Sequence, residues 1–191
     1  MATQPNYKGA LTQYMTHPEE WTYHIPEGMT TMEGALVEPA AVGMHAAVLG
    51  GAQPGKSIVI LGGGTIGLMV LQACISLGAT DITVVDVIEK RLELAKKLGA
   101  ARVINGKEED TVAVLRSEEM YGDHGVDLVF EAAGAVFTAQ QAVQIVSRGG
   151  KIMMVGTQSK PVPIDFLKIN REVTIQTSFR YCNNFPQTIE A

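Results

Sequence analysis

The sequence predicts an α/β fold built on a doubly wound, six-stranded parallel sheet. Six short apolar runs recur along the chain, and stretches with helical spacing of apolar residues separate most of them. Parallel neighbours need long crossover connections, which are right-handed and usually helical. The predicted strands are Ser57–Leu61, Ile82–Asp86, Arg102–Ile104, Val126–Phe130, Lys151–Val155 and Val173–Thr177.

The predicted helices lie before and between these strands. Gly78 and Gly99 follow two of the helical stretches and are typical of helix ends. Pro39 falls inside the first helical stretch, where it should start a new helix or kink an existing one. The predicted helices are Met32–Leu49, Thr65–Leu77, Ile88–Leu98, Glu108–Met120, Val136–Val146 and a short turn at Asp165–Ile169.

A glycine pattern joins the first predicted strand to the helix after it. Gly62, Gly64 and Gly67 fit G-x-G-x-x-G, and Asp86 ends the next strand nineteen residues beyond Gly67. In a Rossmann fold these glycines allow a tight turn, a close approach to a pyrophosphate and a close helix, and the acid binds the adenosine ribose. The alternative is a glycine-rich turn in another βαβ unit. The order of strand, glycines, helix, strand and acid favours a dinucleotide site.

Composition and charge narrow the function further. The 191 residues are 46% hydrophobic and carry a net charge of −5 without a stripe rich in lysine and arginine. This argues against nucleic acid as the main partner. Cys74 and Cys182 form no disulfide framework, and the first residues lack the apolar segment of a signal peptide. Ser57–Thr80 is uncharged but reads as a buried strand, turn and helix, so we expect a cytoplasmic protein and no membrane partner.

The first 29 residues differ from the rest of the chain. Two short aromatic-containing runs lie around Ala10–Thr16 and Trp21–Ile25, and the prolines 18 and 26 restrict the residues before them. We therefore expect strand and turn here rather than helix. We therefore divide the chain into an N-terminal segment, residues 1–29, and the Rossmann domain, residues 30–191.

Three segments carry a resemblance to a known family. They are Gly9–Ala46, which contains EGALVEPAAVGMHA, the glycine fingerprint with VVDVIEKRLELAKKLGA after it, and Ser178–Pro186, SFRYCNNFP. The chain resembles the central NAD-binding portion of a zinc-type medium-chain dehydrogenase/reductase, closest to the sorbitol/xylitol (polyol) dehydrogenases. Butanediol and threonine dehydrogenases share the EP element and the fold, but are less expected to carry the FRYCN segment.

The resemblance implies an enzyme that oxidises a secondary alcohol of a polyol to a ketone and passes hydride to NAD. A zinc ion would polarise the substrate oxygen. In the family a GroES-like catalytic domain with a Gly-His-Glu motif supplies the principal zinc ligands, and the sequence has no such motif. We therefore expect residues 1–29 to be a remnant of that domain and the chain to be an incomplete catalyst. A stand-alone NAD-binding protein is the alternative.

The resemblance also assigns catalytic residues. It places Glu38 beside the catalytic zinc, as a direct or water-mediated metal contact, whereas the alternative is a carboxylate at a helix start before Pro39. It places Arg180 and Tyr181 in the polar network near the substrate. The alternative for Arg180 is a surface side chain paired with an acid such as Glu172.

The same resemblance assigns cofactor-binding residues beyond the three glycines. Asp86 should bind the adenosine ribose and repel the 2′-phosphate of NADP, which favours NAD. Arg91 should lie near the adenosine ribose or a phosphate. Backbone groups of two residues near strand ends should hold the nicotinamide carboxamide. The further positions assigned are Thr65, Ile66, Val155 and Phe179.

Relatives in the family join their nucleotide-binding sheets edge to edge. Val173–Thr177 is rich in β-branched residues and is the candidate edge strand. We therefore expect a homodimer or homotetramer.

Overall fold

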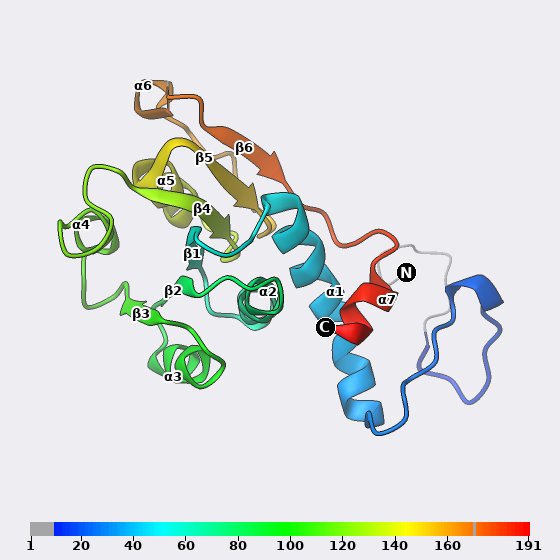
Figure 1. The fold of residues 1–191 in the computed structure, drawn as a ribbon. Coiled ribbons are helices and arrows are strands. Elements are labelled where there is room, and N and C mark those ends of the chain that lie inside the picture. Colours follow the sequence, from blue (N-terminus) through cyan, green and yellow to red (C-terminus); the bar gives the residue numbers. More distant parts are fainter. Residues whose placement is uncertain (1–9, 170) are drawn as a thin grey trace.

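A six-stranded parallel sheet runs through the computed structural model, which describes residues 10–169 and 171–191 (Figure 1). The strands lie in the order β3-β2-β1-β4-β5-β6, and every neighbouring pair is parallel. The predicted six-stranded, doubly wound sheet is therefore confirmed. The strands are β1 Ser57–Leu61, β2 Asp81–Asp86, β3 Arg102–Asn105, β4 Val126–Glu131, β5 Val146–Met154 and β6 Thr174–Thr177.

Helices cover both faces of this sheet. Ile58 and Ile60 of β1 pack in one buried cluster with α1, α2 and α3, while Val59 and Leu61 pack in a second cluster with α4 and α5. α1 also packs along α2, and α7 packs on α1 (Figure 1). The helices are α1 Thr31–Gly50, α2 Thr65–Ser76, α3 Glu89–Lys97, α4 Thr111–Leu115, α5 Val136–Ile145, α6 Phe166–Ile169 and α7 Phe185–Glu190.

The uncharged stretch Ser57–Thr80 forms β1, the glycine turn and α2. β1 is buried at its last four positions, as expected for a central strand with helices on both faces. The predicted buried strand, turn and helix is confirmed. In the described part of the chain, no helix combines the length and the apolarity that a membrane span requires.

The strands predicted in the N-terminal segment are wrong where the segment can be described. Residues 10–29 contain no strand; they form the 3-10 turn η1, Glu19–Trp21, and a turn at residues 27–28. Leu11 is 105% exposed and Tyr14 is 90% exposed, so these apolar side chains have no sheet to pack against. Pro18 and Pro26 also remove backbone donors that a strand would need. Residues 1–9 of the predicted remnant lie outside the described residues.

α1 is one helix although Pro39 lies inside it, so Pro39 does not start a new helix. A capping box fixes its first residue: the Glu33 N–H donates to Thr30 Oγ1 at 3.2 Å, and the Thr30 N–H donates to the Glu33 carboxylate at 2.7 Å. Met44 and its neighbours then bury one side of the helix against α2. This packing outweighs the backbone hydrogen bond that the proline removes.

Other predicted bounds also need correction. α4 is shorter than the predicted Glu108–Met120. The Asp110 carboxylate accepts from the N–H groups of Val112 and Ala113 at 3.0 and 3.1 Å and fixes the helix start, and the helix ends at Leu115 with Arg116 as its C-cap. β5 begins earlier than predicted, at Val146, where α5 ends. α7 was not predicted, because its six residues carry too short an apolar pattern.

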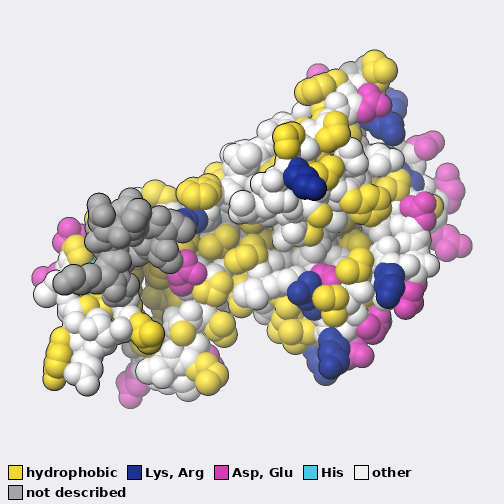
Figure 2. Space-filling model, turned by 180° about the vertical axis from the view of Figure 1, so that it is seen from behind, with side chains coloured by type: hydrophobic (Ala, Val, Ile, Leu, Met, Phe, Trp, Pro, Cys, Tyr) yellow, Lys and Arg dark blue, Asp and Glu magenta, His cyan; other side chains and the backbone are white. Residues whose placement is uncertain are grey.

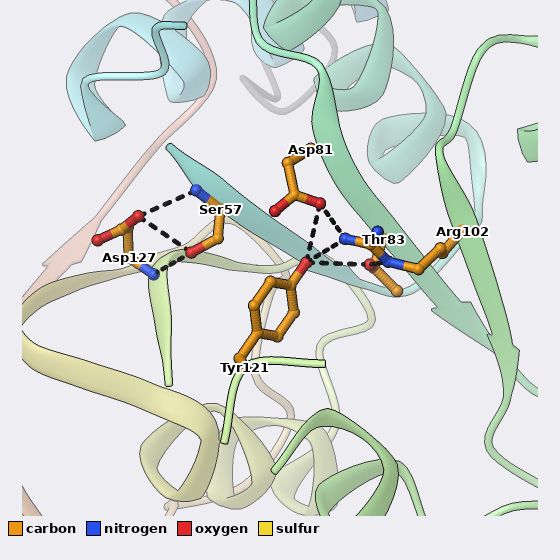
Figure 3. Close-up of polar contacts among 6 residues, drawn as sticks. All are labelled: Ser57, Asp81, Thr83, Arg102, Tyr121 and Asp127. Carbon is orange, nitrogen blue, oxygen red and sulfur yellow. Dashed lines mark hydrogen bonds and ion pairs between the residues drawn. The ribbon is translucent and has the colours of Figure 1, made fainter. Parts of the chain in front are cut away.

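Polar side chains join the strands at the edge where they begin (Figure 3). The N–H and Oγ of Ser57, at the start of β1, both donate to the Asp127 carboxylate of β4 at 3.0 Å. The Tyr121 hydroxyl accepts from Arg102 of β3 at 2.8 Å and donates to Asp81 of β2 at 3.2 Å, and Arg102 also pairs with Asp81. These side chains bind one another across the strands, so we assign this edge a structural role.

Candidate functional site

The carboxyl ends of β1 and β4 adjoin at the centre of the sheet. Leu61 pairs with Glu131, and the next residue, Ala132, donates its N–H to the Leu61 carbonyl at 2.8 Å. β1 leads into α2 on one face, and β4 leads into α5 on the other. After these two neighbouring strands, the chain therefore continues to opposite faces of the sheet. Doubly wound sheets bind their ligands at such a point.

The glycine turn after β1 has the geometry that a dinucleotide requires. Gly62 has φ +110°, a conformation that side chains rarely adopt, and its N–H donates to the Val85 carbonyl at 2.8 Å. A Cβ on Gly67 would lie 1.8 Å from the Gly62 carbonyl oxygen, so α2 can approach the turn this closely only with glycine there. A Cβ on Gly64 would meet nothing within 4 Å. The space beside Gly64 is therefore open to a ligand.

The first turn of α2 faces this open space. Gly64 is the N-cap and provides no side-chain cap, and the first turn has no acidic residue. Its N–H groups and the positive end of the helix dipole are thus left for an anion. Thr65, the first helical residue, is exposed, whereas Ile66 is half-buried and packs against the core. The turn, the open space and the helix start together fit a pyrophosphate.

Asp86 ends β2 next to the glycine turn and is only 8% exposed. One oxygen accepts from the Gly63 N–H at 2.7 Å and lies 3.4 Å from an Arg91 nitrogen. The other oxygen accepts from the N–H groups of Val87 and Ile88 at 2.8 and 2.9 Å. Asp86 therefore holds the turn in shape, a role that the sequence did not reveal. The predicted neighbours Asp86 and Arg91 do lie together.

Val155 and Phe179 follow the carboxyl ends of β5 and β6. The Val155 N–H donates to the Glu131 carbonyl at 2.8 Å, and its side chain packs partly against the core. The Phe179 ring is 79% exposed, and the Arg180 guanidinium carbon lies 5.2 Å from the ring centroid. Both residues thus lie at the same edge of the sheet as the glycine turn.

Glu38 and Tyr181 come from distant parts of the chain and meet at this edge. Glu38 is exposed on α1, and its carboxylate lies near enough to the Tyr181 hydroxyl to act on it. Burial, and then the negative charge of Glu38, raise the pKa of Tyr181, while Arg180 acts in the opposite direction. The Asn184 amide donates to the Ala41 carbonyl of α1 at 2.9 Å and anchors this segment. The structure therefore brings the three predicted catalytic residues together.

Comparison with known proteins decides the family. Residues 65–191 match the profile of the zinc-binding dehydrogenases. The chain belongs to the zinc-binding dehydrogenase family. It is 64% identical over 191 residues to YdjJ of Escherichia coli, an uncharacterized zinc-type alcohol dehydrogenase-like protein, and 39% identical over 193 residues to sorbitol dehydrogenase of Bacillus subtilis. Both matches cover 100% of this chain and 54% of the relative. This zinc-binding dehydrogenase chain thus spans about half the length of the curated relatives it matches.

Solved structures agree with this assignment. An oxidoreductase/dehydrogenase of unknown specificity from Escherichia coli superposes with a TM-score of 0.96 at 63% identity, over 100% of this chain and 55% of that one. A zinc-binding dehydrogenase of Sinorhizobium meliloti, solved with NADP, superposes with a TM-score of 0.83 at 28% identity, over 88% of this chain and 50% of that one. The predicted resemblance to zinc-type dehydrogenases, close to polyol dehydrogenases, is therefore confirmed.

The zinc-binding dehydrogenase chain does not hold a zinc site by itself in its described residues. Within residues 10–169 and 171–191, no three histidine, cysteine, aspartate or glutamate side chains are grouped so that they could bind a metal ion. A protein zinc site needs three or four such ligands. Glu38, the predicted metal-side carboxylate, has the Tyr181 hydroxyl as its neighbour. The described residues therefore fit a dinucleotide, but by themselves they do not form a zinc site.

The sequence predicts Glu131 only as one of the strand ends at this edge and assigns it no role. Glu131, at the end of β4, is fully buried and accepts hydrogen bonds from two different loops. Its position directly after the predicted central strand Val126–Phe130 is the one signal that points to it. Its sequence context, VFEAAG, reads equally well as a strand that ends at the surface.

Proposed function

We propose that the chain forms the NAD-binding portion of a zinc-dependent polyol dehydrogenase. The proposed reaction oxidises a secondary alcohol of a sorbitol-like or xylitol-like substrate to a ketone by hydride transfer to NAD. The observation that carries the proposal is the glycine turn at the carboxyl end of β1, with open space beside Gly64 and the acid Asp86 next to it. The relatives named sorbitol dehydrogenase and D-xylulose reductase support the substrate class.

Each part of the site has a proposed task toward the dinucleotide. The bound dinucleotide supplies the hydride acceptor. The N–H groups at the start of α2 hold the pyrophosphate, with Thr65 at its side, and Ile66 limits the space toward the nicotinamide. Backbone groups of Val155 and Phe179 orient the carboxamide, and Arg91 lies beside the adenosine ribose or a phosphate.

Asp86 makes NAD the proposed cofactor rather than NADP. Asp86 is only 8% exposed, and its acidic side chain lies next to the place proposed for the ribose. A 2′-phosphate there would meet like charge, and Val87 offers no compensating cation. Arg91 lies 3.4 Å from the carboxylate and is held by it. We therefore expect NAD to bind at least about tenfold more tightly than NADP.

Glu38, Tyr181 and Arg180 are proposed to form the substrate end of the site. The raised pKa of Tyr181 keeps its hydroxyl protonated at neutral pH, so the hydroxyl can donate to Glu38 or to a substrate oxygen. The side chains of Arg180 and Tyr181 follow β6 directly, beyond the position proposed for the nicotinamide. The catalytic zinc ligands other than Glu38 are proposed to come from a catalytic domain, of which residues 1–29 are a remnant.

The chain is proposed to be a cytoplasmic homodimer or homotetramer. β6 lies at the sheet edge, and Ile175 in it is 38% exposed. Phe166 and Leu167 of the neighbouring α6 are 72% and 82% exposed, and hydrophobic side chains gather at that end of the molecule in Figure 2. Pairing of two β6 edges would satisfy the free backbone groups and cover these side chains.

A stand-alone NAD-binding protein is the second candidate, because the described residues hold no complete metal site. Calorimetric titration with NAD and with NADP tests the shared part of both candidates. Saturable NAD binding with weaker NADP binding is expected, and absence of NAD binding contradicts both. Oxidation of xylitol or sorbitol by the longer gene product with zinc supports the dehydrogenase. Activity only with butanediol or threonine assigns the chain to those relatives instead.

A further inference from the structure

Glu131 is a buried carboxylate to which the proposed function gives no task. It is 0% exposed, and four donors surround it. The N–H groups of Ala133 and Gly134 and the Thr138 hydroxyl donate to Oε1 at 3.1, 2.9 and 2.6 Å, and the Gln158 amide donates to Oε2 at 2.7 Å. In the described part of the chain, no lysine, arginine or histidine forms an ion pair with it. Hydrogen bonds rather than ion pairs therefore hold this carboxyl group in the interior.

These donors come from two separate loops. Ala133 and Gly134 belong to the loop between β4 and α5, whereas Gln158 belongs to the loop that follows β5. The backbones of the two loops touch, because a Cβ on Gly156 would lie 2.3 Å from the Gly134 nitrogen. The N–H of Gly156 also donates to the Glu131 carbonyl at 2.8 Å. Glu131 thus joins the two loops into one unit through its side chain and its backbone.

This unit lies beside the glycine turn. A Cβ on Gly62 would lie 2.8 Å from the Ala133 nitrogen, so the loop after β4 abuts the turn directly. In a dinucleotide-binding sheet the half that starts with β1 holds one mononucleotide, and the half that starts with β4 holds the other. Because Asp86 belongs to the first, adenosine half, the loops joined by Glu131 form the wall of the nicotinamide half.

One atom of this wall lacks a partner. Gln158 Oε1 is buried and makes no hydrogen bond to the described residues. Its direction is fixed, since the other end of the amide donates to Glu131. A buried acceptor without a donor is costly, and a donor on a bound ligand would remove that cost.

We propose that Glu131 is a positioning residue for the nicotinamide half of the cofactor. Its carboxylate fixes the loops after β4 and β5 against each other, so that their backbone groups and Gln158 keep their places in the crevice. This inference rests on the proposed NAD-binding function and goes beyond it. It predicts that Glu131 affects binding of the nicotinamide half and not of the adenosine half, because β1, β2 and the glycine turn form the adenosine half.

The test compares NAD with AMP, which occupies the adenosine half alone. In Glu131→Gln one carboxylate oxygen becomes an N–H₂ group that faces other donors. We expect the Kd for NAD to rise at least about tenfold and the Kd for AMP to change less than about twofold. Thr138→Val removes a single donor to Glu131 without changing the shape of the side chain, and should weaken NAD binding by about threefold to tenfold. Asp86→Asn is the matched control, which should weaken binding of both ligands.

The outcomes separate the two levels of the proposal. If the unmodified chain binds neither NAD nor AMP, the proposed function fails, and this inference fails with it. If the unmodified chain binds both, but the Glu131 and Thr138 variants lose NAD and AMP affinity equally, Glu131 acts only on the fold. Unchanged NAD affinity in both variants overturns the inference as well. If Glu131→Gln does not fold, the folded Thr138→Val variant and Gln158→Leu, which removes the amide donor, give the same comparison.

Discussion

Replacement of Gly67 by alanine should destabilise the fold, whereas replacement of Gly64 should leave the fold intact and weaken cofactor binding. In Gly67→Ala the new Cβ would lie 1.8 Å from the Gly62 carbonyl oxygen, where ordinary contact begins at 3.4 Å. The turn and α2 would have to separate by about 1.6 Å, and neither obstructing group is a flexible side chain. Overpacking of this kind costs about 1–3 kcal/mol, and backbone obstruction places this case near 3 kcal/mol or above.

For a chain of this length, about 3 kcal/mol corresponds to a fall in Tm of roughly 6–12 °C. In Gly64→Ala the new Cβ meets nothing within 4 Å, and the φ of −71° is ordinary for alanine. Alanine is a poorer N-cap than glycine but restricts the unfolded chain, so the two effects oppose each other and leave a change below about 1 kcal/mol. The added methyl group would project into the space assigned to the pyrophosphate.

Calorimetric melting and NAD titration of the two variants measure these effects side by side. We expect Gly67→Ala to lower the Tm and Gly64→Ala to raise the Kd for NAD at least about tenfold at nearly unchanged Tm. An unchanged Tm in Gly67→Ala would contradict the close approach of α2 to the turn. Unchanged NAD affinity in Gly64→Ala would place the pyrophosphate elsewhere.

Three further predictions follow from single groups. Glu38→Gln should lower the pKa of Tyr181, because the Glu38 carboxylate raises it. Ultraviolet titration, with Tyr181→Phe as the reference, measures this shift, and an unchanged midpoint would refute the contact. Burial raises the pKa of Cys74 to about 12, so a thiol reagent at pH 8 should modify only the exposed Cys182 in the native chain. In denaturant the reagent should modify both cysteines. Rapid reaction of both cysteines in the native chain would contradict this prediction. Ile175→Lys in the exposed edge strand β6 should convert the expected dimer to a monomer in light scattering, and a monomeric unmodified chain would remove the proposed edge pairing.

The central sheet could be predicted from the sequence because its middle strands, β1, β2 and β4, contain short runs of apolar residues that local physics can identify. The glycine pattern and Asp86 could be predicted for a similar reason, since their spacing follows from the turn itself. The N-terminal strands were wrong because strand formation needs a neighbour, and the described part of the chain offers none beside Leu11 and Tyr14. The later start of α4 depended on one side chain, Asp110, which caps the helix at its N-terminus.

The polar contacts inside the site were beyond prediction. That Asp86 accepts from the Gly63 N–H, and that Glu131 binds Gln158, depends on loops whose paths no periodicity encodes. The meeting of Glu38 with Tyr181 joins α1 to the segment after β6, and it was expected only because a family resemblance placed both near one site. Local sequence patterns thus predicted the helices and strands, while tertiary contacts determined the hydrogen bonds of the residues at the strand ends.

The central claim is that a dinucleotide binds at the edge of the sheet where the strands end. Backbone amide shifts of the ¹⁵N-labelled chain during NAD addition test it most directly, because the opposite edge serves as an internal control. We expect shifts at Gly63, Gly64 and Gly67 and in the loop at residues 132–134. We expect no shifts at Ser57 or at Tyr121 and its partners Asp81 and Arg102, which Figure 3 shows. Shifts confined to that opposite edge, or none anywhere at saturating NAD, would contradict the claim.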